Sequence, residues 1–61
     1  MRFGYELRIN GEASIYFTSL KKAKEFAFFH RNGMEFIKRR SWLWLPTSGE
    51  DVGCIERHWL R

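Results

Sequence analysis

The first segment of the chain alternates between apolar and polar side chains. Phe3, Tyr5 and Leu7 fall on one side of an extended chain, whereas the residues between them fall on the other. Successive side chains of a strand point to opposite faces of a sheet. The alternation therefore predicts a half-buried β-strand over residues 2–8.

A second alternating stretch follows Asn10-Gly11, which is a strong hairpin signal. A two-residue loop would point the apolar sets of the two strands to opposite faces of the sheet. A three-residue loop over residues 9–11 would pair Leu7 with Ala13 and put both sets on one face. We therefore predict a hairpin with a type I turn and with Gly11 left-handed in a β-bulge.

Good helix formers fill the next segment, residues 20–31. Thr18 or Ser19 is expected to cap its N-terminus, and Asn32-Gly33 to stop it. At about 100° per residue, one side of this helix is apolar and should pack on the sheet. The apolar side comprises Leu20, Ala23, Phe26, Ala27 and His30.

Residues 34–45 are predicted to form a third, long strand with an irregular pattern. Odd-numbered Ile37 and even-numbered Trp44 are both apolar, and a polar run at residues 38–41 separates two apolar stretches. A β-bulge within the polar run, or apolar groups on both faces, would explain this. Residues 52–60 predict a fourth strand.

The predicted order is ββαββ, an α+β fold with one helix packed on one face of a small four-stranded sheet, antiparallel or mixed. With 61 residues, the chain is expected to form a single domain, residues 1–61. A domain of this size buries about 60% of the surface that its unfolded chain exposes. Six Phe, three Trp and two Tyr predict a dense aromatic core that compensates for the small size.

The net charge of +4 is compatible with a nucleic-acid partner, with an acidic protein surface or with ordinary solubility. Charges interrupt every apolar run, so no membrane-spanning segment is expected. The N-terminus lacks the apolar stretch of a signal peptide. Cys54 is the single cysteine, which excludes a disulfide within the chain and favours a reducing, cytoplasmic setting.

The second half of the chain contains the main candidate contact surface, rich in Trp and Arg. If Ile37 and Leu45 face the helix, Trp42 and Trp44 project from the sheet face that the helix leaves uncovered. Exposed contiguous apolar surface usually marks a contact site. The alternative is that the indoles are buried beneath long basic side chains. The candidate contact residues are Lys38, Arg39, Arg40, Trp42, Trp44, Arg57 and Trp59.

The predicted helix offers a secondary candidate surface on the side opposite its apolar residues. Phe28 lies there among basic side chains and could cover a sheet edge or form a dimer contact. The alternative is a solvated helix face with one exposed aromatic residue, which is common. The secondary surface comprises Lys21, Lys24, Phe28 and Arg31.

No metal site, cofactor site or catalytic set is predicted. Cys54 and His58 lie roughly 13 Å apart on an extended strand, too far to share one ion. Cys54, Glu56 and His58 alternate along one strand face, but neighbours in that series are about 6.6 Å apart, beyond hydrogen-bond reach. We therefore expect the chain not to be an enzyme.

These features predict a small binding or regulatory protein that contacts a larger protein partner, because Trp, Tyr and Arg dominate protein hot spots. A phage-type inhibitor of a host nucleic-acid-handling enzyme matches its size and character by analogy. Direct binding of single-stranded RNA or DNA is the first alternative, because rings stack on bases while cations follow phosphates. A self-associating subunit, with the indoles buried in a homodimer, is the second. The acids expected to repel phosphate, and so to favour a protein partner, are Glu35, Glu50, Asp51 and Glu56.

Overall fold

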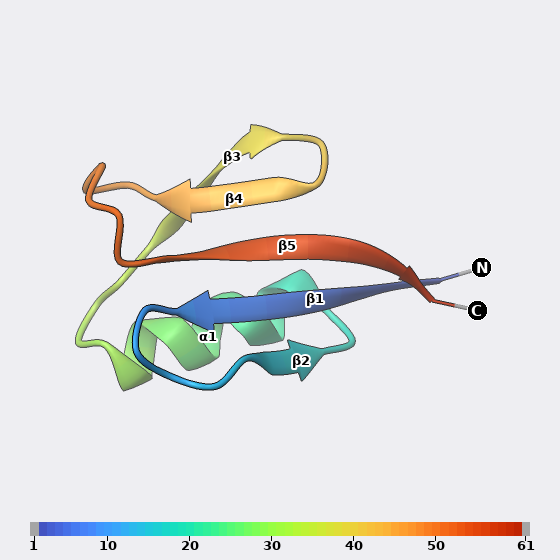
Figure 1. Ribbon diagram of the computed structural model, residues 1–61, viewed down its shortest axis with the longest axis horizontal. Coiled ribbons are helices and arrows are strands. Elements are labelled where there is room, and N and C mark those ends of the chain that lie inside the picture. Colours follow the sequence, from blue (N-terminus) through green and yellow to red (C-terminus); the bar gives the residue numbers. More distant parts are fainter. Residues whose placement is uncertain (1, 61) are drawn as a thin grey trace.

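The computed structural model describes the backbone of residues 2–60 and the side chains of residues 3–59. Its strands form one antiparallel sheet in the order β2-β1-β5-β4-β3, and the helix lies against one face of that sheet (Figure 1). The elements along the chain are β1 (Arg2–Ile9), β2 (Ile15–Phe17), α1 (Leu20–His30), β3 (Phe36–Arg40), β4 (Leu43–Pro46) and β5 (Gly53–Leu60).

The α+β class, with one helix on an antiparallel sheet, is confirmed, but the sheet has five strands and the order is ββαβββ. Residues 34–45 do not form one long strand. The chain reverses at Ser41-Trp42 and forms the β3–β4 hairpin. The polar run that suggested an irregular strand is the end of β3 and the start of this turn. The register also shifts between Lys38 and Arg40, where a bulge was expected.

The apolar side chains of the first hairpin lie on one face of the sheet, as predicted, but the pairing register differs from the prediction. Leu7 pairs with Ile15 instead of Ala13, and both apolar sets still lie on one face because the shift is two residues. The Glu12 N–H donates to the Ile9 carbonyl at 2.9 Å. Gly11 within this turn is left-handed, as predicted, with φ 84°. Between this turn and β2, the Glu12 side chain contacts His30 and Arg31 at the end of α1.

The helix has the predicted start, and it ends at His30, one residue before the predicted end. Ser19 is the cap: its hydroxyl oxygen accepts a hydrogen bond from the Lys22 N–H at 3.1 Å, which satisfies a donor that the first turn leaves free. Asn32, with φ 57°, adopts the left-handed conformation that ends the helix, in place of Gly33, which follows it with φ 95°. The Gly33 N–H donates to the Phe28 carbonyl at 2.7 Å.

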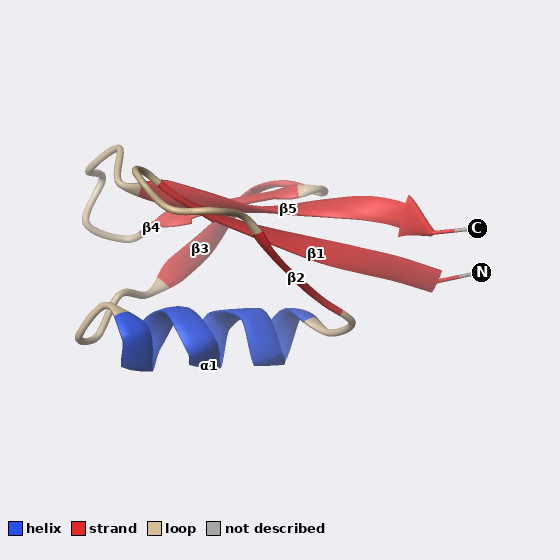
Figure 2. Cartoon of the chain, turned by 60° about the horizontal axis from the view of Figure 1, so that its bottom comes forward, coloured by secondary structure: helices blue, strands red, loops and turns tan. Residues whose placement is uncertain are grey.

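The core lies between α1 and the sheet face that it covers, which we call the helix-side face; the opposite face is the open face (Figure 2). Odd-numbered residues of β1 and β5 point to the helix-side face. Trp44 does so as well, because it pairs with Ile55, and so do Phe36 and Lys38, which precede the register shift in β3. Alanines on α1 let its backbone approach the sheet closely. The buried apolar residues are Leu7, Ile9, Ala23, Ala27, Phe36, Trp44 and Ile55.

Trp44 belongs to this core, so the expectation that it projects from the open face is wrong. Its side chain is 6% exposed and meets the Tyr5 ring edge-to-face, with centroids 5.9 Å apart. Ile37, Leu43 and Leu45 lie on the open face instead of facing the helix. An indole removes more apolar area from water than any of these aliphatic side chains, so burying Trp44 is the more favourable choice.

Candidate functional site

The β1–β5 ladder extends beyond the rest of the sheet and beyond the start of α1 (Figure 2). The β1–β2 pairing stops at Tyr5, and the β4–β5 pairing stops at Glu56. The ladder pairs beyond them form a two-stranded ribbon, which we call the projecting ribbon, residues 2–4 and 57–60. The helix α1 does not cover the helix-side face of this ribbon (Figure 2).

Three side chains pack together on the helix-side face of the projecting ribbon. Phe3 pairs with Trp59 across the ladder, and their ring centroids lie 4.1 Å apart. The guanidinium carbon of Arg57 lies 4.2 Å from the centroid of the Phe3 ring, a cation–π geometry. Trp59 is nevertheless 62% exposed. The ribbon therefore presents an indole that neighbouring side chains hold in place.

Arg57 is half-buried, and its charge is not neutralised by a described carboxylate. Its Nε atom is buried and has no hydrogen-bond partner among the described residues. An unpaired buried donor costs about 1–3 kcal/mol, and such groups in folded proteins call for a reason. The packing against Phe3 compensates in part and keeps a positive charge beside Trp59.

A second exposed indole lies next to the projecting ribbon, in the β3–β4 turn. The carbonyl of Trp42 accepts a hydrogen bond from the Arg57 N–H at 2.9 Å, which fixes the turn against β5. The side chain of Trp42 is 48% exposed. Two segments that are distant in the sequence thus bring two exposed indoles to the same end of the molecule.

Basic side chains gather at this end too. The β3–β4 turn, the projecting ribbon and the start of α1 all lie toward the side of the molecule that carries the described N- and C-terminal residues (Figure 1). The first turn of α1 holds two lysines and no acidic residue, and the cations of β3 are exposed. We call the combined surface the basic aromatic end: Phe3, Lys21, Lys22, Arg39, Arg40, Trp42, Arg57 and Trp59. None of its five cations forms an ion pair with a described residue.

Acidic residues lie toward the opposite end, which we call the loop end: the β1–β2 and β4–β5 loops and the segment after α1 (Figure 1). Glu50 and Asp51 belong to the β4–β5 loop. Glu35 is held beside that loop, because its carbonyl accepts a hydrogen bond from the Thr47 N–H at 2.9 Å. Glu12 lies in the β1–β2 loop. The chain therefore separates its charges, with unpaired cations at one end and most of its acids elsewhere.

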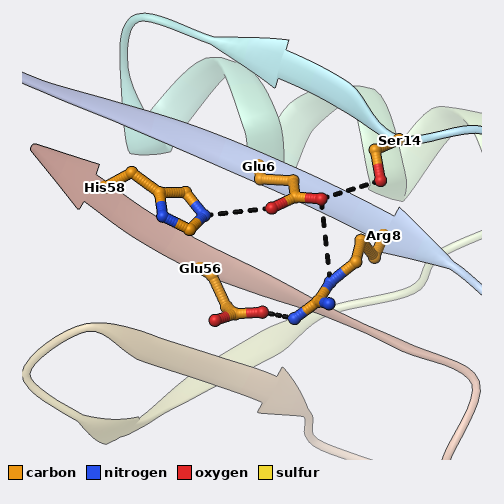
Figure 3. Close-up of polar contacts among 5 residues, drawn as sticks. All are labelled: Glu6, Arg8, Ser14, Glu56 and His58. Carbon is orange, nitrogen blue, oxygen red and sulfur yellow. Dashed lines mark hydrogen bonds and ion pairs between the residues drawn. The ribbon is translucent and has the colours of Figure 1, made fainter. Parts of the chain in front are cut away.

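The open face carries a polar network over the middle of the β1–β5 ladder (Figure 3). The Glu6 carboxylate accepts a hydrogen bond from the Ser14 hydroxyl at 2.8 Å and lies 3.0 Å from Nε2 of His58. Arg8 forms ion pairs with Glu6 and Glu56. The Ser14 hydrogen bond is the main cause that holds the pKa of Glu6 below its ordinary value, with His58 and Arg8 acting in the same direction and burial opposing them.

This network accounts for the polar residues that alternate on β5. Glu56 contacts Arg8 and His58 contacts Glu6, so each has a partner on β1. Glu56 was one of the four acids expected to oppose phosphate in the second hairpin. Its charge is instead compensated by Arg8, and the other three acids lie at the loop end.

The structure places five of the seven residues predicted for the main contact surface at the basic aromatic end. Trp44 is in the core, and Lys38 pairs with Trp44 at the level of Ile55, away from that end. Sequence reasoning missed Phe3 and Lys22; the alternation of the first strand contained Phe3, but its pairing with Trp59 depends on strand order. The five residues at the basic aromatic end are Arg39, Arg40, Trp42, Arg57 and Trp59.

The secondary helix surface does not form one patch. Lys21 lies in the first turn of α1, at the basic aromatic end, whereas Arg31 forms an ion pair with Glu12 at the loop end. Phe28 is exposed and lies between them, and it packs edge-to-face on Phe29 with centroids 5.4 Å apart. Lys24 is half-buried. Phe29, 81% exposed, was missed because the helical pattern put it between the two faces.

Searches for a metal site, for a membrane-spanning helix and for similar proteins gave no match. The described residues contain no group of three His, Cys, Asp or Glu side chains that could hold a metal ion. Within residues 2–60, no helix is long and apolar enough to cross a bilayer. No family model matches the chain, and neither a curated protein nor a solved structure matches it.

Proposed function

We propose that this chain is a small, non-enzymatic binding protein whose contact surface is the basic aromatic end. One observation carries the proposal: exposed Trp42 and Trp59 lie at the same end of the molecule as five cations that form no ion pair with a described residue. Exposed indoles are unfavourable in water, and contiguous surface of this kind usually marks a contact site. Trp and Arg are also the residues that contribute most to binding energy in protein interfaces.

The arrangement of Trp59 supports a binding role beyond its exposure alone. Phe3 and Arg57 pack against each other and hold the projecting ribbon together. A side chain that is already ordered loses less conformational entropy when a partner binds. The indole is thus prepared for contact before the partner arrives.

The polar residues of the open face support a binding role over a catalytic one. His58 contacts Glu6, and Glu56 forms an ion pair with Arg8, so each has its partner on the adjacent strand. The half-buried Cys54 is not among the partners of His58 or Glu56 in this network. A nucleophile activated by a base needs the two groups within hydrogen-bond reach.

The charge separation indicates a partner with a negatively charged surface. The sequence favoured a protein partner because acids were expected to dilute the basic residues of the second hairpin. With Glu35, Glu50 and Asp51 at the loop end, that reason no longer applies. A partner that approaches the basic aromatic end meets positive charge and exposed rings, and complementary charge steers such encounters.

The test is affinity capture from a cell extract with the wild-type chain and with Trp59→Ser and Arg40→Gln variants. The wild type is expected to retain a saturable partner, and both variants to lose most of it. Phe29→Ser is the matched control, because it removes an exposed ring near the loop end. Equal capture by the wild type and Trp59→Ser, or loss only with Phe29→Ser, would overturn the proposal. Nuclease treatment of the captured material shows whether the partner is held through nucleic acid.

A further inference from the structure

Resting on the proposed function, we infer that the ligand of the basic aromatic end is single-stranded nucleic acid. Two kinds of group are needed to bind such a strand without reading a duplex groove. Cations must follow its phosphates, and exposed rings must be available to its bases. Both kinds are present on one end of this molecule, and they come from β3, the β3–β4 turn, β5 and the first turn of α1.

The charge argument is one of complementarity. The cations of the basic aromatic end are not neutralised by described side chains, whereas Arg8 and Arg31, outside it, are both in ion pairs. A phosphodiester chain supplies the missing negative charges at regular intervals and releases its counterions on binding. The acids of the loop end repel phosphate, so a strand is directed to one end only.

The placement of the rings suits bases that are already unstacked. Trp42 contacts the backbone of Arg57, and Trp59 lies two residues farther along β5, about 6.6 Å along the strand. Arg57 is therefore level with Trp42 and two residues from Trp59 along β5. A strand that follows β5 can stack one base on each ring while its phosphates pass the Arg57 cation beside them.

A single strand fits this surface better than a duplex does. Bases inside a duplex expose only their edges in the grooves, so stacking on Trp42 or Trp59 would require them to be unstacked. A single strand pays no such cost. The two shorter dimensions of the molecule are 21 and 19 Å, so the end accommodates about four nucleotides, at the low end of site sizes for small domains.

The first measurement uses a fluorescently labelled oligothymidylate of about 12 nucleotides, long enough for several such sites. Binding is followed by anisotropy of the label and by quenching of tryptophan fluorescence at low salt. The wild type is expected to bind with quenching. The logarithm of its affinity should fall with the logarithm of salt concentration, with a slope of about −0.7 for each phosphate contacted.

Variants separate the two contributions. Trp59→Ser should weaken binding about tenfold and leave the salt slope unchanged, since stacking does not release counterions. Arg40→Gln should reduce the slope by about 0.7 with a smaller loss at high salt. Lys24→Gln, a charge loss in the middle of α1, and Phe29→Ser, a ring loss near the loop end, are the matched controls and should bind like the wild type.

Each other outcome decides against the inference. A duplex of the same length that binds as tightly, or an acidic polyglutamate peptide that competes equally, would show that only negative charge is recognised. If no oligonucleotide binds at low salt, the inference fails, and the proposed function is judged separately by capture that survives nuclease and depends on Trp59. If that capture is also lost, both fail.

Discussion

Along the β1–β5 ladder, the pair Leu7–Ile55 and the pair Phe3–Trp59 occupy equivalent positions on the helix-side face. Both pairs are apolar, and both are joined by the same antiparallel hydrogen bonding. Leu7 and Ile55 are 1% and 0% exposed, whereas Trp59 is 62% exposed. The difference lies in what covers the sheet rather than in the strands themselves.

Element lengths explain this difference. The eight residues of β1 extend over about 26 Å, whereas the eleven residues of α1 measure about 16 Å. One helix of that length covers only part of the ladder. The covered part forms the core, and the uncovered part leaves the large side chain of Trp59 exposed.

The charges follow the same division. At the loop end, Glu12 contacts His30 and Arg31, and the hydrogen bond with His30 is the main cause that lowers the pKa of Glu12. The Asn10 side-chain amide also donates to the Asp51 carbonyl at 2.6 Å. These contacts fasten the loops to one another. The basic aromatic end leaves its charges open, which is the arrangement expected where stability and binding are assigned to different ends.

The sharpest test of the comparison is one truncation in the covered part of the ladder and one in the projecting ribbon. Ile55→Ala should lower the free energy of unfolding by about 2–5 kcal/mol, because it leaves a cavity in the core. Trp59→Ala removes a larger side chain but should cost only about 1 kcal/mol, the value of an aromatic pair. Urea denaturation followed by circular dichroism measures both. Losses of equal size would mean that the projecting ribbon is part of the core after all.

The next largest effect concerns the close contact of the two strands at the loop end. A Cβ atom on Gly53 would overlap the Arg8 carbonyl oxygen and lie 3.1 Å from the Ile9 Cα. Gly53→Ala should therefore destabilise the fold by about 1–3 kcal/mol, as overpacking does. Thr47→Ala in the same region is the control, since Thr47 is exposed, and it should stay within about 0.5 kcal/mol of the wild type. If Gly53→Ala is as stable as the wild type, the two strands can move apart at this end of the ladder at little cost in free energy.

Local sequence signals were enough for part of this architecture. The alternation of residues 2–8 predicted β1, and the run of helix formers after Ser19 predicted α1 with its cap. Both signals depend only on neighbouring residues in the sequence, so they can be recognised without knowledge of the tertiary structure. The same holds for the basic run of residues 38–40, which is exposed in the structure as such runs usually are.

The remainder depended on contacts between distant segments. The turn at Ser41-Trp42 contains Ser41 but no Gly, Pro, Asn or Asp, so its turn signal is weak, and the β3–β4 hairpin was taken for one strand. The choice of Trp44 for the core depended on how it packs against Tyr5. The pairing of the first strand with the last, which creates the projecting ribbon, has no local signal.

On the open face, a pH experiment tests how much the hydrogen bond between Ser14 and Glu6 stabilises the fold. The folded-state pKa of Glu6 is lower than its ordinary value of 4.5, chiefly because of the Ser14 hydrogen bond. The stability that it contributes is therefore present above pH 4.5 and is lost as the pH falls through the folded-state pKa.

Ser14→Ala should consequently be less stable than the wild type at neutral pH by about 1 kcal/mol or less. The difference should shrink at about pH 3, where the carboxylate is protonated in a larger fraction of molecules. Urea denaturation at the two pH values provides the comparison. An undiminished difference in acid would mean that Ser14 stabilises the fold by another route than the Glu6 carboxylate.

The smallest expected effect concerns the start of α1, which belongs to the basic aromatic end. The first turn contains Lys21 and Lys22 and no acid, although the positive end of the helix dipole favours negative charge there. Lys22 is the third residue after the Ser19 cap, so a glutamate at this position can also reach back to the cap's N–H. Lys22→Glu should therefore stabilise the fold by about 0.5 kcal/mol.

The same substitution should weaken oligonucleotide binding, because it replaces a cation of the basic aromatic end with an acid. Lys24→Glu is the matched control: it makes the same charge change farther from the helix start and should have the smaller effect on both properties. A gain in stability together with a loss of binding would mean that binding is favoured at this end at the expense of helix stability. A gain in stability with unchanged binding would remove Lys22 from the contact surface, and no gain would mean that the dipole and the cap contribute less here than their geometry indicates.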